Sequence, residues 1–428
     1  MYRALTEEAA ADWRALAASP LAGDPRIVAT TEADDPPDGY AALLRHERVP
    51  FVSYPYEWPF TLLKRAALLQ LGLLEDAVRA GLVLKDGTPY NVQWDGSRPV
   101  FIDVGSFERL REGEPWAGYR QFCRLHLYPL MLQAFRDVPF QPWLRGRLEG
   151  IEPAELRNLL GLRDRLRRGV LTHVVLHARL ERRYAGRAGE VRGELRRAGF
   201  DRRILLANAR RLRRVVESLD WRGSSEAWGA YTTTSTYTPE DAERKAAFVR
   251  AAVAATEPSL VWDLGCNEGV YARIAAEAAR TVVAVDADAA VADRLAREGH
   301  ERILPLVVDL ADPSPSLGWR GAERGDLAAR GRPDLVLALA LVHHLAITRN
   351  VPLAELVEWL AGLGGAAVVE FVDRSDPMAA RLVAAKREGL HGDYARPAFE
   401  RLLAARFAVE RTLELAGGAR VLYLLRPR

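Results

Sequence analysis

The stretch Val261-Trp-Asp-Leu-Gly-Cys-Asn-Glu-Gly269 predicts a short buried strand that turns on glycines into a helix. The strand is apolar, Gly265 and Gly269 bracket a tight turn, and Val270–Arg280 has the composition of a helix. Glycine has no Cβ, so a turn of this kind brings backbone N–H groups close to a ligand. We therefore expect this stretch to bind a small molecule and to organise an α/β domain.

A second predicted strand, Thr281–Val285, follows at once and ends on an acid, Asp286. This acid lies ~20 residues past the glycines, where a βαβ unit places a carboxylate for ribose hydroxyls. The glycine spacing is G-x-x-x-G rather than the G-x-G-x-x-G of dinucleotide folds, and Asp263 lies two positions before the first glycine. An ordinary strand-turn-helix without a ligand is the alternative.

The alternation of strands and helices continues to the end of the chain. Strands are expected at Ile303–Val308, which ends at Asp309, and at Asp334–Val342, a uniformly apolar run. The remaining expected elements are helices at 352–363, 378–387 and 397–405 and strands at 366–372, 407–413 and 420–425. Together these elements predict a seven-stranded sheet whose last two strands form an antiparallel hairpin.

Two adjacent histidines, His343 and His344, follow the predicted strand Asp334–Val342. Open α/β sheets bind ligands at the carboxyl ends of their strands. Histidine titrates near neutral pH and could accept a proton from a hydroxyl or an amine. We therefore take both as candidate catalytic residues and Glu370, in the next strand, as a lesser one; the alternative is that the histidines only cap the strand or line a pocket.

The stretch Asp263-Leu-Gly-Cys-Asn-Glu-Gly269 resembles motif I of the class I S-adenosylmethionine (SAM)-dependent methyltransferases, with Asn267 where a middle glycine is common. This resemblance implies a Rossmann-like sheet, SAM as the cofactor, and an adenine-binding role for Asp309. In many small-molecule methyltransferases a tyrosine-rich segment before motif I folds over SAM, which adds Tyr231, Tyr237 and Lys245. The SAM-binding residues implied in this way are Asp263, Gly265, Asn267, Gly269, Asp286, Asp309, Tyr231 and Tyr237.

The N-terminal half carries a second pattern. Asp86 and Asn91 have the D-x-x-x-x-N spacing of the protein-kinase catalytic loop, and Asp103-Val-Gly follows where a kinase has D-F-G. In that scheme Asp86 would orient the acceptor hydroxyl, while Asn91 and Asp103 would hold Mg²⁺. However, no glycine-rich phosphate loop is found upstream, and the first lysine, Lys64, lies beyond the segment that should carry it. This half therefore resembles a reduced, mostly helical kinase-like domain that is degenerate.

We expect a kinase-like domain at 1–218 and a methyltransferase domain at 219–428. This order resembles a bacterial methyltransferase group related to nodulation proteins (the NoeA group). The resemblance implies O- or N-methylation of a small-molecule or carbohydrate acceptor. The alternatives are a bifunctional sugar kinase–methyltransferase and a non-enzymatic scaffold that binds SAM or nucleotide. Mg²⁺ and ATP would be needed only if the kinase-like lobe is active.

Composition sets further limits on the 428-residue chain. Residues 145–214 hold twenty arginines against eight acidic residues, which predicts a solvated helical face or an anion-binding or partner surface; nucleic acid is not expected, although this segment leaves it open. Cys123 and Cys266 cannot form a disulfide framework, and no spanning segment or signal region is evident, so a cytoplasmic protein is expected. His173 and His177 lack a third ligand, so no metal site is predicted.

Overall fold

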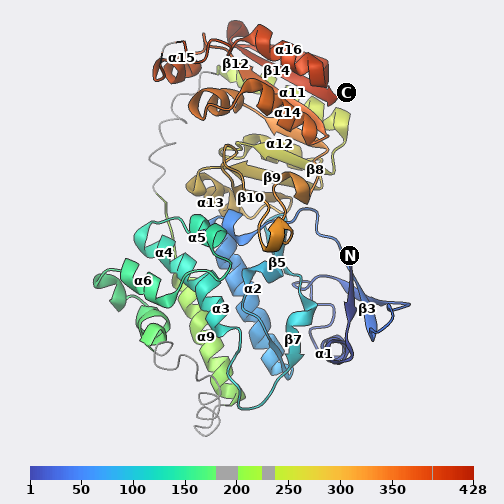
Figure 1. The fold of residues 1–428 in the computed structure, drawn as a ribbon, viewed down its shortest axis with the longest axis vertical. Helices are drawn as coiled ribbons and strands as arrows, with labels where there is room; N and C mark the ends of the chain where they lie inside the picture. Colours follow the sequence, from blue (N-terminus) through green and yellow to red (C-terminus); the bar gives the residue numbers. More distant parts are fainter. Residues whose placement is uncertain (180–200, 224–236, 388) are drawn as a thin grey trace. The chain divides into compact units, whose positions relative to one another are not determined.

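The computed structural model describes residues 1–179, 201–223, 237–387 and 389–428. The chain divides into two units (Figure 1). The first unit comprises residues 1–49, 53–94 and 98–223, and the second comprises residues 50–52, 95–97 and 224–428. Each unit contains its own set of buried apolar side chains.

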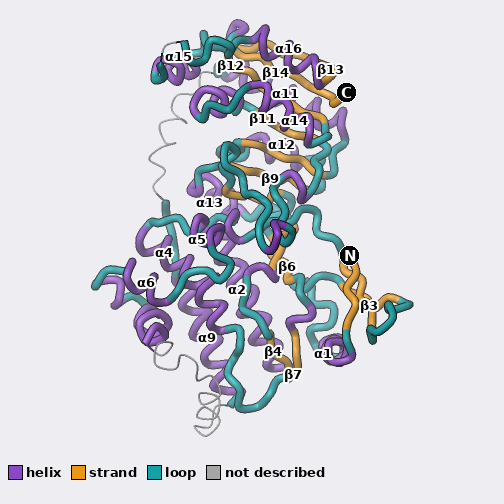
Figure 2. The backbone as a smooth tube through the Cα atoms, viewed as in Figure 1, coloured by secondary structure: helices purple, strands orange, loops and turns teal. Residues whose placement is uncertain are grey.

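A seven-stranded sheet forms the centre of the second unit (Figure 2). Its strand order is β10-β9-β8-β11-β12-β14-β13. The strands are β8 Leu260–Leu264, β9 Thr281–Asp286, β10 Ile303–Val307, β11 Leu335–Ala338, β12 Ala366–Val372, β13 Phe407–Leu415 and β14 Arg420–Pro427. Strands β8 to β12 are parallel, whereas β14 is antiparallel to both β12 and β13. The predicted α/β sheet with a final antiparallel hairpin is confirmed.

Helices cover both faces of this sheet. They are α11 Pro239–Thr256, α12 Val270–Ala276, α13 Ala289–Glu298, α14 Leu353–Gly362, α15 Pro377–Ala384 and α16 Arg396–Arg406. On one face, Val368 of β12 and Leu422 of β14 share a core cluster with α11 and α12. On the other face, the Phe371 ring stacks on Phe399 of α16. Because successive strand residues point to opposite faces, the even-numbered residues of β12 pack against one helix layer and the odd-numbered residues pack against the other.

The predicted strand Asp334–Val342 was too long, because β11 ends at Ala338. Ala340 has φ +50°, a left-handed backbone conformation that interrupts extended structure and is unfavourable for a residue with a Cβ. The Ala340 N–H donates to the Glu370 side chain at 2.9 Å. His343 therefore does not stand at the end of a strand: it precedes a π-helical turn, His344–Thr348.

The first unit is built mainly from helices around α2, Phe60–Arg79. Among the residues described, its other α-helices are α1 Glu7–Ala17, α3 Tyr119–Phe122, α4 Tyr128–Arg136, α5 Gln141–Gly146, α6 Pro153–Leu159 and α9 Arg202–Ser218. A three-stranded antiparallel sheet is formed by β1 Tyr2–Leu5, β2 Thr30–Ala33 and β3 Ala42–His46, with α1 between β1 and β2 in the chain. Two short ribbons complete it: β4 Leu82–Leu84 with β7 Phe107–Arg109, and β5 Val92–Asp95 with β6 Arg98–Phe101.

Helix α2 is buried on most of its surface, because leucine and alanine occupy nearly every turn. Lys64 on this helix donates its ammonium to the carbonyl oxygens of Glu217, at 2.9 Å, and Leu219, at 2.5 Å. These carbonyls belong to the C-terminal end of α9, where a cation is favourable.

None of the helices in the described ranges combines the length and apolar character that a membrane crossing needs.

Candidate functional site

The turn between β8 and α12 has three residues in the left-handed conformation. Gly265, Asn267 and Gly269 have φ values of +72°, +45° and +76°. Asparagine adopts this conformation more readily than most residues with a Cβ, which explains why Asn267 can stand where a middle glycine is common. At Gly269 a Cβ would lie 2.8 Å from Leu295 Cδ1, so a side chain there would be overpacked as well as strained.

Asp286, the last residue of β9, ties this turn to the neighbouring strand. Its Oδ2 accepts a hydrogen bond from the Asn267 N–H at 3.0 Å, and its Oδ1 accepts one from the Asp288 N–H at 2.9 Å. Burial raises the pKa of Asp286, and these backbone N–H groups oppose that rise. A carboxylate oxygen can accept more than one hydrogen bond, so Asp286 keeps capacity for ligand hydroxyls.

Asp263 lies inside β8 and is almost fully buried, with 2% of its surface exposed. Its Oδ2 has no hydrogen-bond partner in the part of the chain that the structure describes. Burial raises the pKa of Asp263 to about 7. Buried polar atoms are normally hydrogen-bonded, so this oxygen is suited to a donor on a bound ligand.

Asp309 follows β10 and is less buried than the other two acids. It pairs with Arg349, and its Oδ1 accepts from the Ala311 N–H at 3.0 Å. Because β8, β9 and β10 are adjacent and parallel, Asp263, Asp286 and Asp309 gather at the carboxyl edge of three neighbouring strands. This edge is where open α/β sheets bind ligands.

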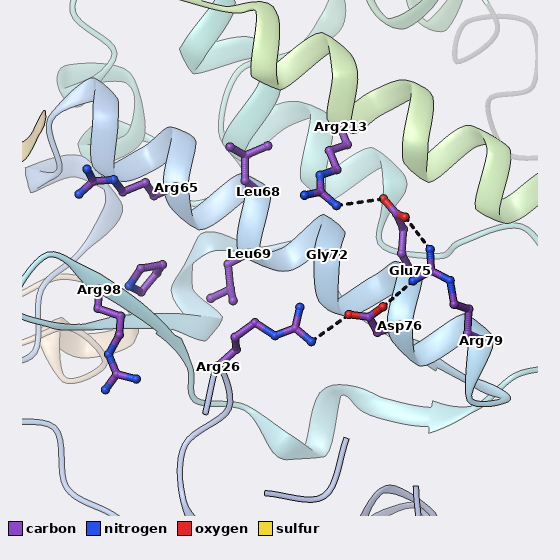
Figure 3. A pocket seen from close by; sticks show the side chains of 11 residues that line it. Arg26, Arg65, Leu68, Leu69, Gly72, Glu75, Asp76, Arg79, Arg98 and Arg213 are labelled. Atoms are coloured by element: carbon purple, nitrogen blue, oxygen red, sulfur yellow. Dashed lines mark hydrogen bonds and ion pairs between the residues drawn. The ribbon is translucent and has the colours of Figure 1, made fainter. Parts of the chain in front are cut away.

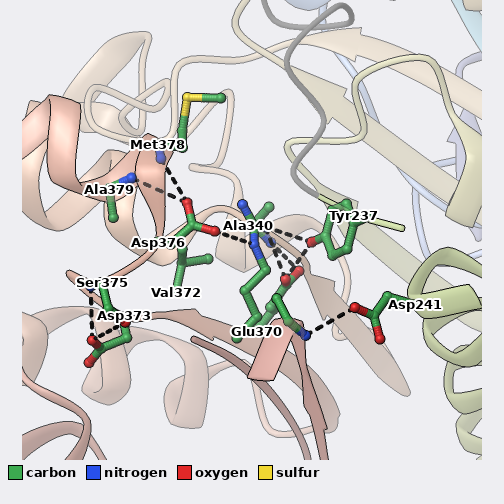
Figure 4. A network of polar contacts seen from close by, with 12 residues as sticks. Tyr237, Asp241, Ala340, Glu370, Val372, Asp373, Ser375, Asp376, Met378 and Ala379 are labelled. Atoms are coloured by element: carbon green, nitrogen blue, oxygen red, sulfur yellow. Dashed lines mark hydrogen bonds and ion pairs between the residues drawn. The ribbon is translucent and has the colours of Figure 1, made fainter. Parts of the chain in front are cut away.

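A buried charged network occupies the neighbouring part of the second unit (Figure 4). We use this name for Tyr237, Lys245, Glu370, Asp376 and Arg420. Glu370 is fully buried and accepts from Lys245 Nζ at 2.7 Å, from Arg420 Nη1 at 3.2 Å and from the Tyr237 hydroxyl. Burial alone would raise the pKa of Glu370, but the charges of Lys245 and Arg420 lower it below its ordinary value. Glu370 is therefore a charged anchor and not a free proton acceptor.

Arg420 extends the charged network to α15. Its Nε donates to Asp376 Oδ2 at 2.8 Å, and its Nη1 donates to the Tyr237 hydroxyl at 2.7 Å. Asp376 in turn accepts from the N–H of Met378 at 2.9 Å, at the N-terminus of that helix. The charged network therefore joins segments that are far apart in the sequence.

Lys245 of α11 brings a nearly buried ammonium, 2% exposed, into the charged network. Its Nζ lies 4.6 Å from the ring centre of Tyr237 and 4.7 Å from that of Tyr271. Burial lowers the pKa of Lys245, and Glu370 opposes that change. Aromatic faces attract cations at this range, so both rings help to keep the ammonium charged.

His343 and His344 lie side by side, with ring centres 4.1 Å apart. His343 is 1% exposed, and its Nδ1 has no hydrogen-bond partner among the residues described. Burial, and then the neighbouring His344, lowers the pKa of His343 well below its ordinary value, and burial lowers the pKa of His344 to about 4. Both imidazoles are thus neutral at pH 7, the form that can accept a proton.

Asp86, Asn91 and Asp103, the residues of the predicted kinase-like pattern, lie near one another in the first unit. Burial raises the pKa of Asp86, and the nearby charge of Asp103 raises it further. The backbone carbonyl oxygen of Asn91 accepts a hydrogen bond from the N–H of Ile102, the residue before Asp103, at 2.8 Å. Asp103 pairs with Arg3 of β1, so the carboxylate that would hold a metal ion in a kinase is already bound to a guanidinium.

His173 and His177, the histidine pair weighed above as metal ligands, are each hydrogen-bonded to a tyrosine. Tyr119 Oη lies 2.7 Å from His173 Nδ1, and Tyr128 Oη lies 2.7 Å from His177 Nδ1. Within the described ranges, no cluster of three or more His, Cys, Asp or Glu residues could hold a metal ion.

Sequence reasoning missed two members of the charged network, Asp376 and Arg420. The available signal was a charged residue in an otherwise apolar strand, since Glu370 interrupts an apolar run and Arg420 stands at the start of one. Two such residues of opposite sign predict a buried pair. Tyr231, the other tyrosine expected near SAM, lies outside the described residues.

The sequence is similar to that of one curated protein, nodulation protein NoeA of Rhizobium meliloti (strain 1021). The two are 36% identical over 388 residues, which cover 90% of this chain and 81% of that protein. No protein-family model matches the sequence.

Solved structures with partial similarity include two bacterial methyltransferases. The N-methyltransferase NodS from Bradyrhizobium japonicum WM9, in complex with S-adenosyl-l-homocysteine, is 13% identical with a TM-score of 0.34 and covers 48% of this chain and 93% of its own. The magnesium protoporphyrin IX methyltransferase ChlM from Synechocystis PCC 6803, with bound S-adenosyl-l-homocysteine, is 17% identical with a TM-score of 0.31 and covers 44% and 84%.

Proposed function

The chain belongs to the family of nodulation protein NoeA, and we propose that its second unit transfers a methyl group from SAM to a small-molecule or carbohydrate acceptor. The observation that carries this proposal is the sheet edge itself. A glycine turn and three acids, Asp263, Asp286 and Asp309, lie there at the carboxyl ends of adjacent parallel strands. The sheet that carries them ends in an antiparallel hairpin.

The residues at this edge fit the chemical groups of SAM. Asp263 offers a buried carboxylate oxygen without a partner to the cationic part of the ligand. Asp286 has remaining acceptor capacity for two ribose hydroxyls. Gly265 and Gly269 keep the turn free of side chains where backbone must approach a ligand. Asp309 lies at the end of the next strand, where it would meet the adenine edge.

SAM supplies a methyl group on a sulfonium, which is already a good leaving group. The protein therefore has to hold the acceptor in line and to receive the proton that it loses. We assign the proton to His343 or His344, because both lie shortly after β11 and His343 Nδ1 lacks a partner among the described side chains. Glu370 serves as a positioning residue, since four donors already occupy it.

We propose that the first unit is a kinase-like lobe that does not transfer phosphate. The Lys64 ammonium is hydrogen-bonded to carbonyl oxygens at the end of α9, and the Asp103 carboxylate is paired with Arg3. A working kinase needs a lysine on the phosphates and an acid on Mg²⁺.

Cys123 and Cys266 are buried free thiols, which supports a reducing compartment such as the cytoplasm.

Calorimetry with SAM and with S-adenosylhomocysteine tests the main proposal. Both ligands should bind to the full-length chain with one site each, and NADH should not. Binding of NADH without binding of SAM would overturn the proposal. The acceptor can then be sought by mass spectrometry of metabolites before and after disruption, as a species that differs by one methyl group.

A further inference from the structure

Arg374 is a charged side chain whose buried donors have no acceptor. It lies two residues beyond the end of β12. Its Nε and Nη2 atoms are buried, and neither forms a hydrogen bond within the described ranges. No carboxylate in the same part of the chain forms an ion pair with it. Because buried donors are normally hydrogen-bonded, this guanidinium is suited to an acceptor on a bound molecule.

The arginines of the first unit provide a contrast. A cavity of about 440 Å³ beside α2 is lined by several arginines (Figure 3). There, Arg26 pairs with Asp24 at 2.6 Å, and Arg213 pairs with Glu217 at 3.1 Å. Their charges are thus compensated by the protein itself. The number of arginines therefore does not indicate a ligand, whereas a guanidinium with buried and unsatisfied donors does.

The turn that carries Arg374 is held by bonds in which the Arg374 side chain takes no part (Figure 4). The Asp376 N–H donates to the carbonyl oxygen of Asp373 at 3.0 Å. The N–H and the hydroxyl of Ser375 donate to Asp373 Oδ1 at 3.0 Å and 2.9 Å. The Asp376 carboxylate accepts from Arg420 at 2.8 Å. The two acids that flank Arg374 in the sequence are therefore bonded to other donors.

A second buried nitrogen without a partner lies in a neighbouring segment. His391 Nε2 has no hydrogen-bond partner among the residues described. The Tyr394 N–H donates to the carbonyl oxygen of His391 at 3.1 Å, and the Tyr394 hydroxyl donates to that of Val372 at 2.7 Å. Burial raises the pKa of Tyr394, and the positive charge of Arg374 opposes that rise. Tyr394 therefore holds this segment against the end of β12, near Arg374.

The carboxyl ends of the five parallel strands divide between the cofactor and the rest of the reaction. Asp263, Asp286 and Asp309, which we assign to SAM, belong to β8, β9 and β10, while β11 and β12 follow on the other side of β8. The proposed histidine base follows β11, and Arg374 follows β12. Neighbouring strands are ~4.8 Å apart, so a small molecule can reach from one strand end to the next. The molecule that has to lie beside the base is the methyl acceptor.

We infer that Arg374 binds an anionic group of the methyl acceptor, either a carboxylate or a phosphate. Nε and Nη2 form one edge of the guanidinium, and such an edge donates two parallel hydrogen bonds to either group. The inference rests on the methyl transfer proposed above and makes the acceptor more specific. The acceptor is a charged small molecule, such as a sugar acid or a sugar phosphate, because a neutral sugar lacks the group that Arg374 requires.

Saturation-transfer difference NMR on the full-length chain, saturated with S-adenosylhomocysteine, tests this inference. The probes are glucuronate and glucose 6-phosphate, with glucose as their neutral counterpart. We expect one charged probe to bind while glucose does not, and the affinity to fall as salt is added. Comparison of the two charged probes distinguishes a carboxylate from a phosphate.

Arg374→Gln should weaken binding of the charged probe at least tenfold. Arg374→Lys, which keeps the charge but not the paired donors, should bind with intermediate affinity. Arg381→Gln is the matched control, because Arg381 is an exposed residue of α15 and the substitution removes the same charge. Its affinity for the probe should stay within twofold of the wild type. Calorimetry should show that each variant binds S-adenosylhomocysteine within twofold of the wild type.

The stability of Arg374→Gln separates a binding role from a structural one. A structural arginine contributes hydrogen bonds that its replacement loses, whereas Arg374 forms none to the described residues. The midpoint of urea unfolding, followed by circular dichroism, should therefore not fall. A clear fall relative to Arg381→Gln would indicate a structural role and would overturn the inference.

Failure of this inference is distinguishable from failure of the proposed function. If S-adenosylhomocysteine does not bind to the wild-type protein, methyl transfer is wrong and the inference falls with it. If it does bind, three results would overturn the inference alone. Neither charged probe binds; or Arg374→Gln and Arg381→Gln lose probe affinity equally, as a diffuse surface potential requires; or Arg374→Gln loses affinity for S-adenosylhomocysteine instead, which would assign the guanidinium to the carboxylate of the cofactor.

Discussion

Replacing Glu370 by Gln should destabilise the second unit strongly. The substitution keeps the shape of the side chain but removes the charge that compensates Lys245, at 2.7 Å, and Arg420, at 3.2 Å. Lys245 and Glu370 are both buried, with 2% and 0% of their surfaces exposed. Removing one partner of a buried ion pair costs about 3–5 kcal/mol, because the other charge is left uncompensated.

Urea denaturation followed by circular dichroism measures this loss, with Glu410→Gln as the matched control. Glu410 of β13 pairs with Arg426 of β14, and both side chains are about 40% exposed. An exposed pair of this kind contributes roughly 0–1 kcal/mol. The reasoning is refuted if Glu370→Gln and Glu410→Gln lose the same free energy of unfolding. If Glu370→Gln fails to fold, the double variant with Lys245→Met should recover folded protein, because it removes the uncompensated ammonium.

The pH dependence gives a second readout of the same variant. Burial lowers the pKa of Lys245 below its ordinary value of 10.5, and loss of Glu370 should lower it further. The unfolded chain then binds more protons than the folded chain in the window below pH 10.5, so the free energy of unfolding rises with pH there. The deficit of Glu370→Gln relative to the wild type should therefore shrink as the pH rises from 7 toward 10.

Further predictions concern the two units separately. Asp286→Ala should lose roughly 2–4 kcal/mol of SAM binding by calorimetry, because ligand hydroxyls lose their acceptor; unchanged affinity would remove Asp286 from the site. His343→Ala or His344→Ala should cut methyl transfer roughly 10²–10⁴-fold with little change in SAM affinity, and two rates within a few-fold of the wild type would refute a histidine base. Intact protein given radiolabelled ATP and a panel of sugars should transfer no phosphate; transfer that is lost in both Asp86→Ala and Asp103→Asn would show a working kinase.

The strands of the second unit could be predicted because their signal is local. A strand buried on both faces is a nearly continuous apolar run, and Ala366–Val372 was predicted with the bounds that the structure shows. The same rule failed between Leu339 and Val342, where the run stays apolar but the strand has ended. Apolar composition cannot separate a buried strand from a buried turn, and the bond from the Ala340 N–H to Glu370 joins positions thirty residues apart.

In the candidate site, too, residues with a local sequence signal were predicted, and residues defined by long-range contacts were missed. The glycine turn and the acids at the ends of β8, β9 and β10 follow from spacing within about fifty residues, and the structure gathers them at one edge. Arg420 and Asp376 were missed because their role depends on contacts with Glu370 and Tyr237, which come from other parts of the chain. A charged residue beside an apolar run indicates a buried ion pair, but it does not identify the partner.

The position of His343 also depends on contacts between distant parts of the chain. Ala340 adopts a left-handed backbone that costs of order 1–3 kcal/mol for a residue of this type, and its N–H is held by Glu370 Oε2 at 2.9 Å. Glu370 is in turn fixed by Lys245 of α11 and by Arg420 of β14. The direction of the chain from β11 to His343 is thus set by a buried carboxylate whose partners come from both ends of the unit. A change far from the sheet edge in sequence, at Lys245 or Arg420, should therefore displace the histidine even though neither residue needs to touch the acceptor.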